Sequence, residues 1–397
     1  MESTATISNK KDQQIRKFGE IIQMIRNIFS TPTDFIPLHK PYFGGNEKKY
    51  LEETIDSTFV SSVGPFVDKF EEMMQQITGA KYAVATTNGT TALHLSLLVA
   101  GVKKGEEVIT QALTFVATSN AIAHAGAVPI FVDVDKDCLG MSAVSLKDWL
   151  DKNAKVNSEK QCINKITGNR IAACLPMHSF GLPLQIEDIV TVCREYHIPV
   201  IEDAAESLGS YIGESHTGTF GLLGTFSFNG NKTITCGGGG AVITNDEALA
   251  KKAKHLSTTA KVPHKWEFAH NEIGYNYRLP NLNAALACAQ LEQLPAILAN
   301  KRSLAQLYKQ FFKNTDIEFI EERTGTTANY WLNTIMFRTE EEQLAFLDFT
   351  NNNGVMTRPA WKLMTELPMY ALCERGNLDN SEYMVQRLVN IPSSYRP

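Results

Sequence analysis

The order of apolar and polar segments between about residues 80 and 245 is the feature that most constrains how this chain folds. Short apolar runs typical of strands alternate with segments whose apolar residues recur at helical spacing. The predicted strands cover residues 81–87, 107–110, 129–134, 171–176, 199–202, 225–228 and 241–244, and the predicted helices cover 90–100, 115–125 and 186–196. This alternation predicts an α/β fold with a mainly parallel sheet and helices on both faces. Ligands of such sheets bind at the carboxyl ends of the strands.

The segments on either side of this region predict three parts in the chain. Residues 1–12 are polar and aperiodic, which predicts disorder. Apolar residues then recur at helical spacing from Ile15 to Ile28, which predicts an amphipathic docking helix that ends near Ser30. We expect an N-terminal extension (1–35), a large domain (36–270) and a smaller α+β domain (271–397).

Within the C-terminal part, the pattern predicts both helices and strands. Residues 282–312 form a helical stretch that Pro295 breaks in two. The remaining predicted elements are strands at 317–321, 330–337 and 355–359 and helices at 340–351 and 382–389.

Composition excludes several classes of protein. The 397 residues include 38 Lys and Arg and 43 Asp and Glu, a formal charge of −5 without a basic block, so nucleic acid and membrane surfaces are not expected partners. No apolar stretch approaches the roughly 18 residues of a membrane span. The seven scattered cysteines form no C-x-x-C pair, so neither a disulfide framework nor a metal site is predicted. Without a signal-like N-terminus, the chain is expected to be cytoplasmic.

The segment Asn88–Leu93 (NGTTAL) closes a predicted strand and opens a helix. The free N–H groups and the dipole of a helix N-terminus favour a bound phosphate. Gly89 would let the backbone approach the anion, and the hydroxyls of Thr90 and Thr91 would add donors. Taken alone, the segment is better explained as an ordinary capped helix start.

Two charged residues occur where the sheet pattern places ligands. Asp203 ends the apolar strand PVIED, and a partly buried carboxylate there needs a cationic partner, although it could equally cap the next segment. Lys232 lies between two short strands and is followed by Gly237–Gly240. Desolvation favours the neutral, nucleophilic form of a lysine amine. A lone lysine is more often a solvated surface residue.

Several known motifs for nucleotide binding, hydrolysis and zinc binding are incomplete or missing in this sequence. Gly230-Asn-Lys-Thr lacks the G-K-[ST] of a phosphate-binding P-loop, and the chain has no G-x-G-x-x-G after a strand and no G-x-S-x-G. His264 and His270 lack the H-E-x-x-H spacing of a zinc site.

The individually weak signals gain weight from their order. An anion cradle, an aromatic residue (Phe115), a strand-end carboxylate (Asp203) and a lysine (Lys232) follow one another along the chain. Pyridoxal phosphate requires these four functions: a phosphate site, a ring-stacking face, a carboxylate at the pyridine nitrogen and a lysine that forms a Schiff base.

From Ile36 onward the chain resembles the sugar aminotransferases of the DegT/DnrJ/EryC1/StrS family. The motifs that carry the resemblance are FVSSVGP (59–65), NGTTALHL (88–95), TFVATSNAI (114–122), IEDAAESLG (201–209), SFNGNKTIT (227–235) and GYNYRLPNLNAALACAQLEQL (274–294). Their wording is most similar to the subgroup that acts in legionaminic acid and bacillosamine synthesis. The resemblance implies the fold of aspartate-aminotransferase-type enzymes, with pyridoxal phosphate as cofactor.

The resemblance also implies roles for single residues. Lys232 would bind the cofactor covalently and move the proton, and Asp203 would pair with the pyridine nitrogen. The phosphate would lie on Gly89, Thr90, Thr91 and Ser227, and Phe115 would stack on the ring. Glu206 occurs where many members carry Gln or His near the ring hydroxyl, and Asn229 replaces a histidine. Asn276 would reach the phosphate of the neighbouring subunit's cofactor, which implies a homodimer with shared active sites.

The implied reaction transfers the amino group of L-glutamate to C4 of a nucleotide-linked 4-keto-6-deoxy sugar. The substrate expected from the subgroup is UDP-linked 2-acetamido-4-keto-6-deoxyglucose, for surface polysaccharide or glycan synthesis. Candidate contacts to the sugar nucleotide are His178, Arg278, Tyr330, Trp331 and Arg358. Tyr330 and Trp331 could instead be core residues, and either arginine a structural ion pair.

Two other functions remain open from the sequence. Some members of the family dehydrate sugars at C3 with a histidine in place of the lysine, and Lys232 argues against that chemistry. A sensor without turnover is the second alternative, but a binding module has no need for a reactive lysine.

Overall fold

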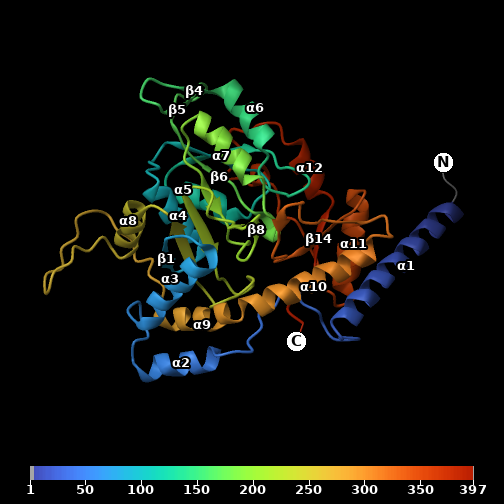
Figure 1. Ribbon diagram of the computed structural model, residues 1–397. Helices are drawn as coiled ribbons and strands as arrows, with labels where there is room; N and C mark the ends of the chain where they lie inside the picture. The colour runs from blue at the N-terminus through green and yellow to red at the C-terminus, as the bar shows by residue number, and fades with distance from the viewer. Residues whose placement is uncertain (1–3, 397) are drawn as a thin grey trace.

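The computed structural model describes residues 4–396, with backbone alone over 4–12. Figure 1 shows a large α/β unit, a smaller unit built from about the last hundred residues, and a long N-terminal helix beside the smaller unit. Among the described residues, no helix combines the length and the apolar character required to cross a membrane.

The central sheet contains seven strands in the order β3-β2-β6-β7-β10-β11-β1, in which parallel bridges link β6 to β7. Its strands are β1 (Tyr82–Thr86), β2 (Glu107–Gln111), β3 (Val128–Val132), β6 (Ile171–Leu175), β7 (Ile201–Asp203), β10 (Leu223–Ser227) and β11 (Gly240–Thr244). Strand β11 pairs antiparallel with both of its neighbours, and the other six strands run in one direction. The prediction of a mainly parallel sheet is confirmed.

Helices cover both faces of this sheet because successive strand residues point to opposite sides. Val108 packs with helices α4 (Gly89–Val99), α5 (Val116–His124) and α8 (Glu247–Ser257), whereas the next residue, Ile109, packs with α6 (Ala143–Asn153) and α7 (Ile186–Glu195). Both side chains are fully buried, so each strand supplies two cores.

A further group of helices covers the β1 half of the sheet, on the face that α6 and α7 cover over the other half. It contains α2 (Glu47–Asp56), α3 (Pro65–Thr78) and α9 (Asn281–Glu292), and Phe70 and Ala284 lie in the same core as strand residues of β1 and β11. Helix α9 ends at Glu292, and α10 (Leu294–Phe312) begins after Gln293 with Pro295 in its first turn, which confirms the predicted break. The domain division at residue 270 stays a prediction. Helix α9, which follows this boundary, packs against strands of the large unit.

The smaller unit is an antiparallel sheet covered by helices. Strands β12 (Glu318–Phe319), β14 (Asn333–Met336), β16 (Leu388–Ile391) and β15 (Arg358–Pro359) pair in that order, with helices α10, α11 (Glu340–Asn352) and α12 (Asp379–Val385). The prediction of one helix over 382–389 is wrong. Its end is strand β16, because Leu388 and Val389 pair with β14 and enter the core.

Short elements complete the chain. They are strands β4 (Ala154–Val156), β5 (Cys162–Asn164), β8 (Tyr211–Ile212), β9 (Ser215–His216) and β13 (Thr326–Thr327) and single 3₁₀ turns at Ser179–Gly181 and Met364–Glu366.

Helix α1 (Thr4–Ile28) docks on the smaller unit of its own chain, beside α11 (Figure 1). Phe18, Ile21 and Ile25 are buried there, and the Phe18 ring packs edge-on against Phe346 at 5.2 Å between centroids. The disorder predicted for residues 1–12 is wrong for 4–12, which are helical, and residues 1–3 lie outside the described part. A docked segment removes the nucleation cost, so the helix extends into the polar residues.

Candidate active site

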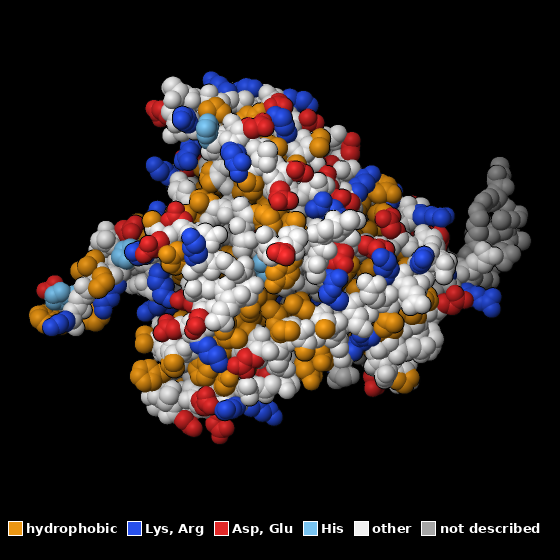
Figure 2. All heavy atoms as spheres, viewed as in Figure 1, with side chains coloured by type: hydrophobic (Ala, Val, Ile, Leu, Met, Phe, Trp, Pro, Cys, Tyr) orange, Lys and Arg blue, Asp and Glu red, His pale blue; other side chains and the backbone are white. Residues whose placement is uncertain are grey.

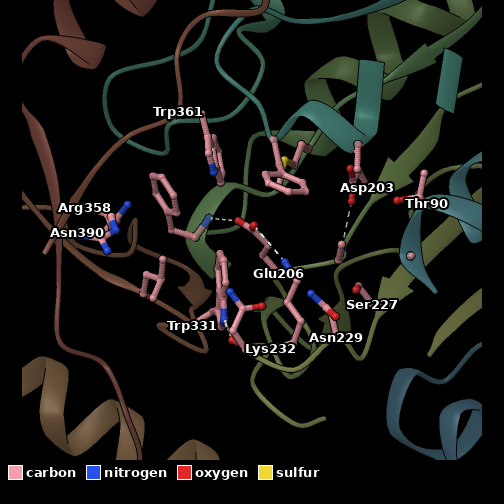
Figure 3. A pocket seen from close by; sticks show the side chains of 18 of the residues that line it. Thr90, Asp203, Glu206, Ser227, Asn229, Lys232, Trp331, Arg358, Trp361 and Asn390 are labelled. Carbon is pink, nitrogen blue, oxygen red and sulfur yellow. Dashed lines mark hydrogen bonds and ion pairs between the residues drawn. The ribbon is translucent and has the colours of Figure 1, made fainter. Parts of the chain in front are cut away.

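A cavity of about 640 Å³ opens at the carboxyl ends of the parallel strands, between the large and the smaller unit. The large unit contributes Thr90, Asp203 and Ser227 to its wall, and the smaller unit contributes Trp331 and Arg358. Figure 3 shows these side chains converging on one space from elements far apart in the sequence. Its place is the one that the strand–helix alternation predicts for a ligand.

The N-terminus of α4 forms one end of the cavity. The Asn88 side chain accepts a hydrogen bond from the backbone N–H of Thr91 at 2.9 Å, and the Thr91 hydroxyl accepts one from the N–H of Asn88 at 3.2 Å. This reciprocal cap uses the Thr91 hydroxyl, and Thr91 does not line the cavity. Gly89 and Thr90 do line the wall, and a contact of Thr91 with an anion stays a prediction.

Gly89 allows α4 to approach strand β10 closely. A Cβ atom at position 89 would lie 2.7 Å from Cβ of Ser227, a distance that side chains do not adopt. The result is a concave surface of helix N–H groups beside the hydroxyls of Thr90 and Ser227. Such a surface suits a phosphate.

Asp203 is held at the end of β7. Its Oδ2 accepts a hydrogen bond from the Thr118 hydroxyl at 2.7 Å, and its Oδ1 accepts one from the N–H of Ala205 at 3.1 Å. Burial raises the pKa of this carboxyl above its usual range. Parallel pairing places Asp203 opposite Thr225, two residues before Ser227, so the sheet register brings the carboxylate and the anion cradle together.

Lys232 lies in the turn after β10, with its amine in the cavity. Its Nζ is 3.2 Å from Oε1 of Glu206 and 4.1 Å from the centre of the Trp331 ring. The second oxygen of Glu206 accepts a hydrogen bond from the N–H of Phe180 at 2.8 Å. Burial raises the pKa of Glu206 to about 7, against the lowering effect of the Lys232 charge. The amine is thus held between a buried carboxyl group and an aromatic face.

Aromatic rings line the cavity between its two ends. Phe115 is 44% exposed and packs edge-on against Trp361 at 6.0 Å, and Trp361 lies over Phe180 at 4.6 Å between ring centres. Phe180 adopts a left-handed backbone (φ 56°), which is strained for an aromatic residue. Sequence reasoning missed Trp361 and Phe180, because neither belongs to a periodic segment or a chemical motif.

The residues predicted to contact a sugar nucleotide divide into two groups. Trp331 and Arg358 line the cavity, and Asn390, which the sequence did not indicate, lies beside Arg358 because strands β15 and β16 pair these residues. Arg358 donates hydrogen bonds to Asn351 Oδ1 at 3.0 Å and to the Thr357 carbonyl at 2.9 Å. In Figure 3, Arg358 and Asn390 lie on the side of the cavity opposite Thr90 and Ser227.

His178 and Tyr330 do not line this cavity. His178 is fully buried, its Nε2 is 3.0 Å from Glu202, and its Nδ1 accepts a hydrogen bond from Leu184 N–H. Tyr330 is buried in the smaller unit, where its hydroxyl accepts a hydrogen bond from the Glu322 N–H at 3.1 Å. The polar atoms of these side chains are used within the core, and a contact of either residue with the sugar nucleotide stays a prediction.

Asn276 and Arg278 do not line the cavity of their own chain. The Arg278 Nε donates to Asn276 Oδ1 at 2.9 Å, and Asn276 bridges to Thr258 at the base of a projecting arm formed by residues 259–275. In Figure 1 this arm extends beyond α8, away from the smaller unit.

The residues of the cavity fit pyridoxal phosphate. The α4 N-terminus and Ser227 would hold the phosphate, and Asp203 would pair with the pyridine nitrogen. Lys232 would bind the carbonyl carbon, and Phe115 would cover the ring. Each of these groups lines the same cavity. The donor set has the two charges that this cofactor requires, a carboxylate and an amine.

A family profile described as "DegT/DnrJ/EryC1/StrS aminotransferase family" matches residues 41–396. The chain belongs to this family. It is a pyridoxal-phosphate-dependent sugar aminotransferase, with the fold expected from the sequence. The resemblance to the family is confirmed, whereas the legionaminic acid and bacillosamine subgroup is not the one named among the relatives below.

Individual DegT/DnrJ/EryC1/StrS relatives align over most of the chain. The GDP-perosamine synthase of Escherichia coli O157:H7 is 38% identical over 337 residues, 85% of this chain and 87% of the relative. That of Vibrio cholerae is 35% identical and covers 90% of this chain and 94% of its own. The crystal structure of the aminotransferase TlmJ from Streptoalloteichus hindustanus superposes with a TM-score of 0.81, at 25% identity, over 90% of this chain and 93% of that one.

Proposed function

We propose that this protein transfers the amino group of L-glutamate to C4 of a nucleotide-linked 4-keto-6-deoxy sugar. The observation that carries the proposal is the position of the Lys232 amine, which faces the cavity between Glu206 and Trp331 while Asp203 and the α4 N-terminus line the same space. An amine, a buried carboxylate and an anion cradle in one cavity are the protein groups that transamination requires.

The chain's own residues would divide the work as follows. Bound pyridoxal phosphate would supply an electron sink, which Asp203 would maintain through the pyridine nitrogen. Lys232 would take a proton at Nζ from the α-carbon of glutamate and later deliver one to C4 of the sugar. Glu206 is 3.2 Å from this Nζ and would hold it toward the reacting carbon. The surrounding aromatic rings would limit access of water to that carbon.

Arg358 and Asn390 would bind the other end of the substrate. A guanidinium group pairs with phosphate oxygens through two parallel hydrogen bonds, and Asn390 would add a neutral donor. Trp361 and Trp331 offer flat faces to a sugar ring. The diphosphate would then lie at the wall formed by the smaller unit, and the keto carbon would lie near Lys232.

For the sugar nucleotide itself, we propose UDP-linked 2-acetamido-4-keto-6-deoxyglucose, on the wording of the motifs around Asp203 and Lys232. The product would then enter the synthesis of bacillosamine, legionaminic acid or a related surface glycan. A GDP-linked keto sugar is the second candidate, because the Escherichia coli and Vibrio cholerae relatives are named GDP-perosamine synthases.

We also propose that two copies form a homodimer in which each completes the other's site. The arm at 259–275 exposes large apolar side chains, with Trp266 74%, Phe268 79% and Ile273 84% accessible. Figure 2 shows hydrophobic side chains on this projection. Exposed apolar clusters of this kind mark protein interfaces. Asn276 at the base of the arm would reach the phosphate site of the second copy.

One assay tests the proposal. The purified protein, supplied with pyridoxal phosphate and glutamate, is offered UDP-, GDP-, dTDP- and CMP-linked keto sugars, and 2-oxoglutarate and the amino sugar are measured. We expect the two to form in equal amounts with one nucleotide. A deoxygenated sugar without a retained amine would support the dehydratase instead, and cofactor binding without any product would support a sensor.

A further inference from the structure

Lys301, in the first half of α10, is a lysine inside the core of the protein. Its side chain is 1% exposed, and none of the ion pairs found among the described residues includes it. Burying an ammonium group without a carboxylate is costly, so an apolar residue would fill this space at lower cost. Burial lowers the pKa of Lys301 to about 7. Compared with an apolar residue, the lysine therefore adds the hydrogen bonds that its amine donates.

The Lys301 amine joins three segments that are distant in sequence. Its Nζ donates to the carbonyl of Ser393 at 2.7 Å and to the carbonyl of Trp331 at 3.1 Å, and it lies 3.1 Å from Nε2 of His39. These acceptors belong to the C-terminal tail, the lead into β14 and the segment after α1. Leu38, next to His39, lines the active-site cavity.

Trp331 connects the Lys301 amine to the turn that carries Lys232. Its indole ring lies 4.1 Å from the Lys232 amine, and its Nε1–H donates to the Asn231 carbonyl at 2.6 Å. Its backbone N–H donates to the Asn329 side chain at 2.7 Å. Lys301 therefore holds the carbonyl of Trp331, and Asn329 holds its N–H.

Asn329 belongs to the same framework. Its side-chain NH₂ donates to the carbonyl of Glu206 at 2.9 Å and to the Thr233 hydroxyl at 3.3 Å, one residue after Lys232. Tyr330, between Asn329 and Trp331, adopts a left-handed backbone (φ 48°). A non-glycine residue keeps this conformation only where its surroundings impose it, and the contacts of Asn329 and Lys301 on either side do so.

We propose that Lys301 is a positioning residue: it fixes the Trp331 backbone, so that the indole ring keeps the Lys232 amine aligned with the reacting carbon. This inference rests on the proposed role of Lys232. The charged and titratable groups around Lys232 are Glu206, in contact, and Asp203 and His39 at longer range. Replacing Lys301 leaves Glu206 and Asp203 unchanged, whereas His39 loses its contact with the Lys301 amine, whose charge helps to lower the pKa of His39.

The test uses Lys301→Met, which keeps the length and apolar stem of the side chain but removes its donors. Lys309→Met is the matched control, because Lys309 lies on the same helix and is half exposed, paired with Glu321. Both proteins are loaded with pyridoxal phosphate, trapped with borohydride, and titrated between pH 5 and 10 by visible absorbance; kcat and KM are measured on the active substrate.

We expect Lys301→Met to trap the cofactor at Lys232 but to lose about tenfold in kcat, with KM for glutamate little changed. The pH midpoint of the visible absorbance should fall, because the indole face stabilises a cation beside it. Trp331→Phe should show the same changes, and the double variant should be no worse than the single ones. Lys301→Arg should recover part of kcat, since it retains donors.

The inference is overturned if Lys301→Met folds and shows the midpoint and kcat of wild type, or if its effect and that of Trp331→Phe add. If Lys301→Met does not fold, the deciding variant is His39→Leu, which removes one of the three groups that contact the Lys301 amine. A smaller fall in the pH midpoint of the absorbance and in kcat supports the inference. Wild-type values of both overturn it. Failure of the wild-type protein to trap the cofactor at Lys232 would defeat the proposed function as well.

Discussion

The amine of Lys232 and the carboxyl group of Glu206 lie 3.2 Å apart, and both side chains are largely removed from solvent. The carboxyl group is fixed from its other side by the Phe180 N–H. A buried pair of this kind costs desolvation energy, and removal of one partner leaves the other uncompensated. The pair is therefore expected to control both the reactivity of the amine and the pH dependence of the protein.

Replacement of the amine tests its chemical role. Lys232→Ala should abolish transamination, with a loss of at least about 10³-fold in kcat, because no other amine lies in the described cavity to bind the cofactor and move the proton. The fold should persist, as shown by an unchanged circular dichroism spectrum. Borohydride should label wild type at position 232 and leave the variant unlabelled. Normal turnover by the variant would contradict the assignment.

Glu206 should make stability depend on pH. Its pKa of about 7 in the folded protein exceeds the ordinary value of 4.5, so the folded state keeps the proton to higher pH than the unfolded chain. The free energy of unfolding should therefore decrease as pH rises from about 4.5 to 7, by up to about 3 kcal/mol, and then level off.

Glu206→Gln removes this titration, so the cofactor-free variant should lose less stability than wild type between pH 5 and 8. Urea unfolding at the two pH values measures the difference. An identical pH dependence in the two proteins would show that Glu206 does not titrate in this range.

Gly89 should be required for cofactor binding. Gly89→Ala places a methyl group 2.7 Å from Cβ of Ser227, so α4 must shift away from the anion cradle. We expect the Kd for pyridoxal phosphate to rise by about tenfold or more. Gly19→Ala, at a position with open space around it, is the control and should leave the Kd unchanged. Equal affinities for the two variants would argue against a phosphate site here.

The N-terminal helix should stabilise the smaller unit through its apolar face. Phe18→Ala removes a buried ring that packs with Phe337 and Phe346, and should cost about 3–5 kcal/mol. Ile15→Ala, on the same helix at a 46% exposed position, should cost less than about 1 kcal/mol. Chemical denaturation of the two variants compares them. Similar small losses would mean that α1 does not dock in solution.

A shared dimeric site predicts complementation between inactive variants. Lys232→Ala mixed with Asn276→Ala should recover up to about a quarter of wild-type activity, because half of the randomly formed dimers are mixed and each contains one intact site. Lys232→Ala mixed with Asp203→Ala should recover none, since both residues act within one chain. No recovery with Asn276→Ala would show that this residue does not serve the other copy.

Much of the central fold could be predicted from local pattern. Val108 and Ile109 are apolar neighbours in a short run, and such a run is typical of a strand buried on both faces. Strand β16 escaped prediction, because its residues read equally well as the end of helix α12; pairing with β14 decides in favour of the strand. The docking of α1 on its own chain also depended on a partner surface that the sequence pattern does not reveal.

Some residues of the candidate site could likewise be predicted from the sequence, and others could not. Asp203, Lys232 and Gly89 could be found because each is a chemically unusual residue beside a strand end. Trp361, Asn390 and Lys301 carried no such signal, and His178 and Thr91 proved to be committed to hydrogen bonds within the fold.

The sequence alone determined the parallel sheet and the cofactor and predicted Lys232 as the amine that would bind it, because these depend on local periodicity and on residue types next to strand ends. Only the tertiary structure decided which side chains share the cavity and which buried amine supports Trp331. Contacts between distant segments such as His39, Lys301 and Ser393 depend on packing in three dimensions, and spacing along the chain does not encode them.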